Sequence, residues 1–204
     1  MPPWCARCGQ PEPLFGLCRT CHDWPAALRC ARSAVWLDAA ARRAVHALKY
    51  GGLPRIAGDL AAAMVRVALP DARAAVLVPI PLARTRMRAR GYNQSEHLAR
   101  HLAHRWHRPV RQLLLRTRDT ATQTTLTPAA RLANVAGAFQ VRNEECGVRN
   151  ANSEFPIPHS TFVLIDDVFT TGATLAAAAR ALQDAGALSI MAVTFGRAVI
   201  PDFT

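Results

Sequence analysis

The sequence predicts an α/β protein, in which helices flank a central parallel sheet and a small cysteine-rich module precedes it. Continuous apolar runs at 74–78 and 163–165 are typical of strands that are buried on both faces of a parallel sheet. Segments with helical periodicity alternate with these runs, and that order favours βαβ crossovers. Five of the six cysteines lie within the first 30 residues. We therefore expect a module at 1–32 and an α/β domain at 33–204.

The cysteine-rich module contains two Cys-x-x-Cys pairs that are separated by nine residues. The four residues are Cys5, Cys8, Cys18 and Cys21. A segment this short rarely folds on its own core, and four thiolates at this spacing are typical of a structural Zn²⁺ site with no open coordination position. Two disulfides or free thiols are the alternative, and disulfides fit a cytoplasmic chain poorly. We interpret Cys30 as a buried thiol and His22 as a surface imidazole.

Composition indicates a globular protein that favours contact with polyanions. Half of the 204 residues are hydrophobic, yet no apolar run approaches the ~18 residues that span a bilayer. The start, Met-Pro-Pro-Trp-Cys, lacks the basic and apolar regions of a secretory signal, so we expect a cytoplasmic protein. The net charge of +11 favours nucleic acid and phosphate-rich small molecules alike. Arginine supplies nearly all of the positive charge. Codon usage in a GC-rich genome would also produce an excess of arginine, so the charge alone assigns no DNA site.

The α/β domain opens with a short strand at 35–37 and two helices. Asp38 is suited to cap the first helix, which runs to Lys49 and ends at a pair of glycines. The second helix is expected at 55–69, where apolar residues recur at near-helical spacing. Lys49 has two interpretations: it reaches an anionic ligand, or it is solvated near the end of its helix.

A rigid loop follows the strand at 74–78, because Val-Pro-Ile-Pro stops strand pairing there. In an open α/β sheet, ligands bind at this carboxyl edge. Arginines then alternate along 84–90, which we interpret as a loop that either clamps anion oxygens or is solvated, with Arg84 and Arg90 as the individual candidates. Asn93 and Glu96 have the spacing of a capping box for the next helix. In the alternative interpretation, Asn93 and Gln94 contact a base or a ribose.

The middle of the chain is polar and gives weaker signals. We expect strands at 110–115 and 137–141 and a final strand at 189–195. Residues 116–126 have no periodicity, which fits either a mobile lid over a site or an exposed loop. Residues 142–159 read as a loop or a disordered insertion.

The strongest signal is a strand that leads through two carboxylates and a loop of small residues into a helix at 175–185. Amide groups at a helix start attract phosphate, and Gly172 lets the backbone approach it. The carboxylates of Asp166 and Asp167 cannot bind phosphate directly, but they accept hydrogen bonds from ribose hydroxyls or act through Mg²⁺. A ligand that carries a diol and a phosphate on one sugar satisfies both halves.

This stretch resembles the signature with which type I phosphoribosyltransferases bind 5-phosphoribosyl 1-pyrophosphate (PRPP). In that family two acids hold the ribose hydroxyls, which implies this role, and a catalytic one, for Asp166 and Asp167. The resemblance assigns the 5-phosphate to Thr170, Thr171, Gly172, Ala173 and Thr174. It assigns the pyrophosphate, with its Mg²⁺, to Pro79, Ile80, Pro81, Arg84 and Arg118.

Three further segments resemble the ComF family, in which a phosphoribosyltransferase domain follows a cysteine-rich region. They read H-A-L-K-Y-G-G at 46–52, R-G-Y-N-Q-S-E at 90–96 and R-x-R-D-T-x-x-Q-x-x-L at 116–126. The resemblance implies the type I phosphoribosyltransferase fold and a protein that transfers or recognises a phosphoribosyl group, linked to natural competence and DNA uptake. The alternative is a non-catalytic accessory factor that binds nucleotide or single-stranded DNA beside a competence helicase. The second substrate and a homodimer stay open.

Overall fold

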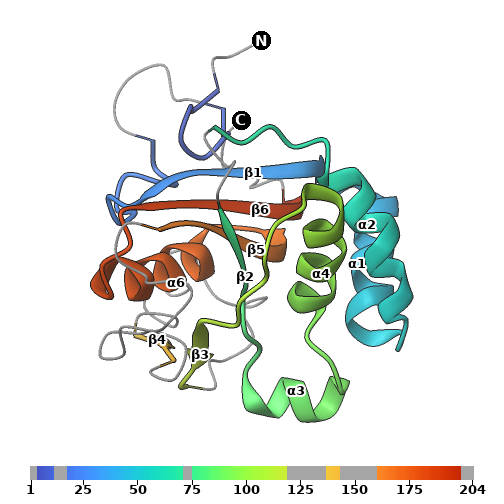
Figure 1. Ribbon diagram of the computed structural model, residues 1–204. Helices are drawn as coiled ribbons and strands as arrows, with labels where there is room; N and C mark the ends of the chain where they lie inside the picture. Colours follow the sequence, from blue (N-terminus) through green and yellow to red (C-terminus); the bar gives the residue numbers. More distant parts are fainter. Residues whose placement is uncertain (1–3, 12–17, 71–74, 119–136, 143–159, 199–204) are drawn as a thin grey trace.

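The computed structural model describes residues 4–11, 18–70, 75–118, 137–142 and 160–198. Within these ranges, Figure 1 shows a sheet with helices on both of its faces, as the sequence predicts. Most of the expected lid and nearly all of the polar segment at 142–159 lie outside the described residues. None of the described helices has the length and apolar character that crossing a membrane requires.

Four parallel strands form the central sheet in the order β1–β6–β5–β2. The strands are β1 (Leu28–Trp36), β2 (Val76–Pro79), β5 (Thr161–Phe169) and β6 (Ser189–Arg197). The parallel sheet predicted from the apolar runs is therefore confirmed. β1 begins earlier than the strand expected at 35–37 and runs across residue 32, so a domain boundary at that residue stays a prediction.

The carboxyl ends of β2 and β5 meet at one edge of the sheet. Pro79 ends β2 and pairs with Ile165, and the amide of Ile80 donates to the Ile165 carbonyl at 3.0 Å. Asp166 follows directly in β5 and pairs with Thr194 of β6. This register brings the loop after β2 next to the acid pair, as parallel strands joined by right-handed crossovers require.

Helices cover the two faces of the sheet in separate layers. The main helices are α1 (Ala39–Tyr50), α2 (Ala57–Met64), α4 (Gln94–Trp106) and α6 (Ala173–Asp184). Successive side chains of a strand point to opposite faces, so β5 contributes to two cores. Phe162 and Leu164 pack with α6, whereas Val163 and Ile165 pack with α1, α2 and α4.

The ends of the helices follow local sequence signals. Asp38 caps α1, because its Oδ1 accepts a hydrogen bond from the Ala41 amide at 2.7 Å. A 3₁₀ turn at Pro54–Ile56 precedes α2, which is shorter than the helix expected at 55–69. Asn93 caps α4 through the Ser95 amide at 3.0 Å.

Two sequence predictions require correction. The arginine-rich segment at 84–90 is a helix, α3 (Arg84–Arg90), rather than a loop, and it ends at Gly91 with a φ of +80°. The strand expected at 110–115 is confined to β3 (Leu114–Arg116), which pairs antiparallel with β4 (Phe139–Val141). β3 and β4 lie beside the sheet at the lower left of Figure 1.

Candidate functional site

The acid pair lies inside β5, at the edge of the sheet where β2 ends. Asp166 Oδ1 accepts hydrogen bonds from the Ser95 hydroxyl and from the Asp167 amide, both at 2.9 Å. Asp167 Oδ2 lies 2.7 Å from Nζ of Lys49 in α1, and the two side chains are 5% and 24% exposed. Lys49 is therefore the shielded partner of Asp167, a role that neither of its sequence interpretations described.

Burial and neighbouring charges shift the protonation of this site. Burial raises the pKa of Asp166 to about 7, and repulsion from the Asp167 carboxylate acts in the same direction. Lys49 and the Ser95 hydroxyl oppose this shift because they stabilise the charged carboxylate. Burial disfavours the charged form of Lys49, but the attraction of both aspartates and the hydrogen bond to Asp167 together outweigh it, so the Lys49 pKa is raised. Lys49 therefore holds a fixed positive charge against the acid pair.

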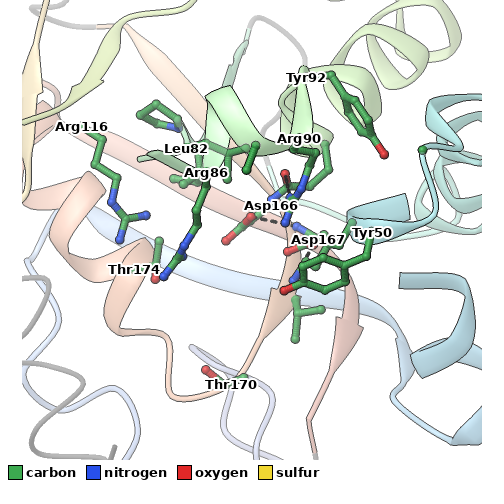
Figure 2. Close-up of a pocket in the computed structure, with 17 residues that line it drawn as sticks. Tyr50, Leu82, Arg86, Arg90, Tyr92, Arg116, Asp166, Asp167, Thr170 and Thr174 are labelled. Atoms are coloured by element: carbon green, nitrogen blue, oxygen red, sulfur yellow. Dashed lines mark hydrogen bonds and ion pairs between the residues drawn. The ribbon is translucent and has the colours of Figure 1, made fainter. Parts of the chain in front are cut away.

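A cleft of about 650 Å³ opens in front of the acid pair (Figure 2). Asp166 and Asp167 line it together with the loop after β5. The loop after β2 and three arginines also line it; these residues are Ile80, Pro81, Leu82, Arg86, Arg90 and Arg116. In Figure 2 the guanidinium groups of Arg86 and Arg116 point toward Thr174. The cleft thus joins an acidic region to a basic one.

The loop after β5 leads directly into α6, which begins at Ala173. Gly172 precedes the helix with a φ of +77°, a conformation that glycine adopts without strain. Amide groups in the first turn of a helix lack intrahelical partners and, with the helix dipole, favour an anion. Thr170 and Thr174 line the cleft, whereas Thr171, Gly172 and Ala173 do not. We call residues 170–174 the anion loop.

The arginines that line the cleft agree only in part with those singled out in the sequence. Arg90 lines it, together with Arg86 and Arg116, whereas Arg84 and Arg118 are exposed and do not. Residues four apart share one face of a helix, so α3 presents Arg86 and Arg90 together. Recognising 84–90 as a helix from its sequence would have identified that pair.

Asn93 and Gln94 support the walls of the cleft. Asn93 Nδ2 donates to the Ile80 carbonyl at 3.0 Å, while its oxygen caps α4, so the capping interpretation holds. Gln94 accepts a hydrogen bond from Arg90, whose guanidinium carbon lies 5.2 Å from the ring centroid of Tyr50. Pro79 pairs within the sheet and does not line the cleft.

The four cysteines of the amino-terminal pairs come together, as the sequence predicts. Their sulfur atoms all lie within 4.8 Å of one another. The Cys5–Cys21 and Cys8–Cys18 sulfur distances are 3.6 Å and 3.5 Å. A disulfide needs a separation of about 2.0 Å, whereas a tetrahedral Zn²⁺ with bonds of about 2.3 Å places its sulfur ligands about 3.8 Å apart. The geometry therefore fits a structural zinc ion and no disulfide.

The pKa values of the cysteines diverge in the absence of a metal. Burial raises the pKa of Cys8 to about 12 and also raises that of Cys21, whereas backbone and side-chain hydrogen bonds outweigh burial and lower the pKa of Cys5 to about 7. Cys30 is a buried free thiol in β1 and His22 is exposed beside Asp23, so both match their sequence interpretations.

Comparison with known proteins identifies the family. No protein-family model matches the chain. The chain is 30% identical to the competence protein ComFC of Bacillus subtilis (strain 168) over an alignment of 204 residues. The alignment covers 95% of this chain and 77% of that protein. This chain belongs to the ComF family.

Two other relatives extend the comparison for this ComF protein. It is 31% identical over 153 residues to the DNA utilization protein YhgH of Escherichia coli (strain K12), and 31% identical over 131 residues to competence protein F of Haemophilus influenzae (strain ATCC 51907 / DSM 11121 / KW20 / Rd). These matches cover 72% and 64% of this chain. They span 62% and 52% of the respective relatives. The names of these relatives support a link to competence and DNA utilization.

Proposed function

We propose that this ComF protein binds PRPP in the cleft and transfers or recognises its phosphoribosyl group. The observation that carries the proposal is that the acid pair and the anion loop open into a shared cleft, with arginines beside them. A ligand for this cleft must offer hydroxyl groups to carboxylates and a phosphate to amides and hydroxyls. The ribose 5-phosphate portion of PRPP offers both, and its pyrophosphate suits the arginines.

Each group of residues then has a distinct role in binding. Asp166 and Asp167 accept hydrogen bonds from the ribose hydroxyls. The amides of the anion loop and the Thr170 and Thr174 hydroxyls donate to the 5-phosphate. Arg90, a candidate from the sequence, holds the pyrophosphate together with Arg86 and Arg116, which take the place of Arg84 and Arg118. Mg²⁺ bound with PRPP supplies further neutralisation of the pyrophosphate charge.

The proposed transfer is a substitution at C1 of the ribose. The electron pair of a nucleophile forms a bond to C1, while the bond from C1 to the pyrophosphate oxygen breaks and pyrophosphate leaves with its electrons. Positive charge that develops on the sugar in this step is stabilised by the two carboxylates. The Lys49 ammonium lies 2.7 Å from Asp167 and helps to hold that carboxylate in place beside the sugar.

Isothermal titration with PRPP and Mg²⁺ tests the binding half of the proposal. Wild type should bind, and Asp166→Ala should weaken binding by tenfold or more, which corresponds to a loss of about 1.4 kcal/mol. Asp184→Ala is the matched control, because Asp184 is an exposed aspartate at the end of α6. Equal affinity of wild type and Asp166→Ala would refute the assignment of the acid pair.

Turnover requires a separate experiment, because the second substrate cannot be read from the cleft. Purine and pyrimidine bases are supplied one at a time with PRPP and Mg²⁺, and pyrophosphate release is measured. Release that depends on one base and is lost in Asp166→Ala supports a transferase. Binding of PRPP without release for any base supports recognition alone.

A second candidate is a non-catalytic accessory factor that binds nucleotide or single-stranded DNA during transformation. The names of the relatives and the net charge of +11 favour it. Binding of DNA through arginines releases counterions, so its affinity should fall steeply with salt. Tight, salt-dependent binding of single-stranded DNA by a protein that releases no pyrophosphate would support this candidate against the transferase.

A further inference from the structure

The amino-terminal module contacts the anion loop from behind. Trp24 lies three residues after Cys21, is 6% exposed, and packs edge-on against Phe169 with ring centroids 6.0 Å apart. A Cβ atom added at Gly172 would lie 2.8 Å from Cζ2 of Trp24 and 3.1 Å from the Phe169 ring. The indole edge therefore occupies the space beside Gly172, and the loop backbone rests against it.

The position of Trp24 depends on the cysteine pairs. The Trp24 amide donates to the Cys21 carbonyl at 3.2 Å. Arg7, which lies between Cys5 and Cys8, donates to the carbonyls of Cys21 and Trp24 at 3.0 Å and 3.3 Å. Its guanidinium carbon also lies 5.7 Å from the centroid of the Trp24 ring. Hydrogen bonds and a cation–π contact therefore join the cysteine cluster to the indole of Trp24.

A second connection runs through Arg197 at the end of β6. Arg197 is 4% exposed, and its guanidinium carbon lies 4.1 Å from the ring centroid of Phe169, which directly precedes Thr170. The Arg197 side chain also donates a hydrogen bond to the Cys8 sulfur. Arg197 thus links the cysteine cluster to Phe169, the residue just before the anion loop.

We propose that Trp24 and Arg197 are positioning residues for the anion loop, and that a metal ion held by the four cysteines strengthens anion binding at that loop. The identity of the anion rests on the function proposed above, whereas the mechanical connection does not. Linkage is reciprocal, so the bound anion strengthens metal binding by the same factor. Couplings of this kind typically change affinity by about 5- to 150-fold.

The physical basis is the conformational freedom of the loop. When the metal fixes the cysteines, Trp24 and Phe169 restrict the backbone at Gly172, a residue that otherwise samples many conformations. The amides of the first turn of α6 are then preorganised for a phosphate, and binding loses less conformational entropy. Without the metal, the indole edge is no longer held and the ligand must order the loop itself.

The first test needs no ligand and uses hydrogen exchange on the full chain with and without zinc. Removal of zinc by a chelator should speed exchange at the amides of 170–174. Amides of α4 (Gln94–Trp106), which packs on the other face of the sheet, are the internal control and should not change. Unchanged exchange at 170–174 in the zinc-free protein overturns the proposal. If exchange in α4 is faster as well, removal of zinc unfolds the whole protein. The ribose 5-phosphate affinities of the zinc-loaded variants described below then test the proposal.

The second test measures ribose 5-phosphate affinity in zinc-loaded variants. Trp24→Ala should retain one zinc ion per chain but bind ribose 5-phosphate about 5- to 150-fold more weakly, and Trp24→Phe should restore much of the affinity. Trp4→Ala is the matched control, because Trp4 belongs to the same module and is 47% exposed. Wild-type affinity in a zinc-loaded Trp24→Ala protein overturns the proposal.

The two proposals fail in different ways. If zinc-loaded wild type does not bind ribose 5-phosphate but the exchange at 170–174 responds to zinc and to Trp24→Ala, the assigned ligand is wrong and the mechanical connection stands. If wild type binds ribose 5-phosphate with the same affinity before and after zinc removal, the ligand stands and the connection is refuted.

Discussion

Lys49 shows how one residue sets the charge of the site. Its ion pair with Asp167 is shielded, and removing one partner of such a pair leaves a buried charge without compensation. We predict that Lys49→Met lowers the free energy of unfolding by about 3–5 kcal/mol at pH 8, measured by urea denaturation. Arg100→Met removes the exposed Arg100–Glu96 pair and should cost about 1 kcal/mol or less. Equal losses in the two variants would show that the Lys49 pair is not shielded.

Asp166 predicts a specific pH dependence of stability. Its pKa is about 7 in the folded protein, above the value of about 3.9 for an unfolded chain. The folded state therefore holds the proton more tightly, so this residue makes stability fall as pH rises from about 4 to about 7. Asp166→Asn should remove that contribution and flatten the curve of unfolding free energy against pH. The exposed Asp184→Asn variant should retain the wild-type slope, and parallel curves for all three proteins would contradict the raised pKa.

At the residue scale, the sequence located four residues that line the cleft but not all of their partners. Asp166, Asp167, Thr170 and Thr174 line it because a strand and the helix that follows it fix their relative positions, and their roles in binding stay predictions. The ion pair to Lys49 joins α1 to β5, which are far apart in the chain. No local pattern encodes such a contact, since it depends on how the two elements pack.

At the scale of elements, α3 explains why the sequence singled out Arg84 with Arg90, whereas Arg86 and Arg90 line the cleft. Its sequence has no buried apolar positions, so the amphipathic pattern that reveals most helices is absent. Two weaker signals were present: arginine, methionine and alanine are good helix formers, and Gly91 is a typical residue after a helix end. β5, in contrast, was predicted from its apolar run, and its observed length places both acids inside the strand.

A substitution at Gly172 measures the contact between the anion loop and Trp24. Gly172→Ala forces a side chain into the left-handed region and sets its Cβ 2.8 Å from Trp24. We predict a loss of unfolding free energy of about 1–2 kcal/mol from the backbone alone, with an additional loss from the contact. Gly91→Ala is the matched control, because Gly91 has a φ of +80° and no atom within 4 Å of an added Cβ. Urea denaturation of both variants gives the contact energy as their difference, and no difference would contradict the crowding at Gly172.

At the scale of the whole molecule, the sequence separated a zinc module from an α/β domain but could not predict their packing. The spacing of the cysteines encodes the metal site locally. The contacts of Trp24 with Gly172 and Phe169 arise only when the chain returns through β5 and α6. β1 belongs to both parts, since it follows the last cysteine pair and pairs with β6 along its length. The module is therefore built into the sheet.

The Arg7 side chain connects the cysteine pairs, Trp24 and the start of β1. Its guanidinium donates to the carbonyls of Leu28, Cys21, Trp24 and Pro25 at distances of 2.7–3.3 Å. Lysine keeps the charge but cannot reach several carbonyls with a planar fork, and each buried acceptor left unpaired costs about 1–3 kcal/mol.

Arg7→Lys should therefore lower both the free energy of unfolding and the affinity for zinc in competition with a chelator. Arg29→Lys is the control, because Arg29 is exposed on β1, and both of its values should match wild type. Loss of stability with unchanged zinc affinity would mean that Arg7 supports the sheet alone. Because Arg7 binds the carbonyls of Cys21 and Trp24 through one guanidinium, we expect the two losses to occur together.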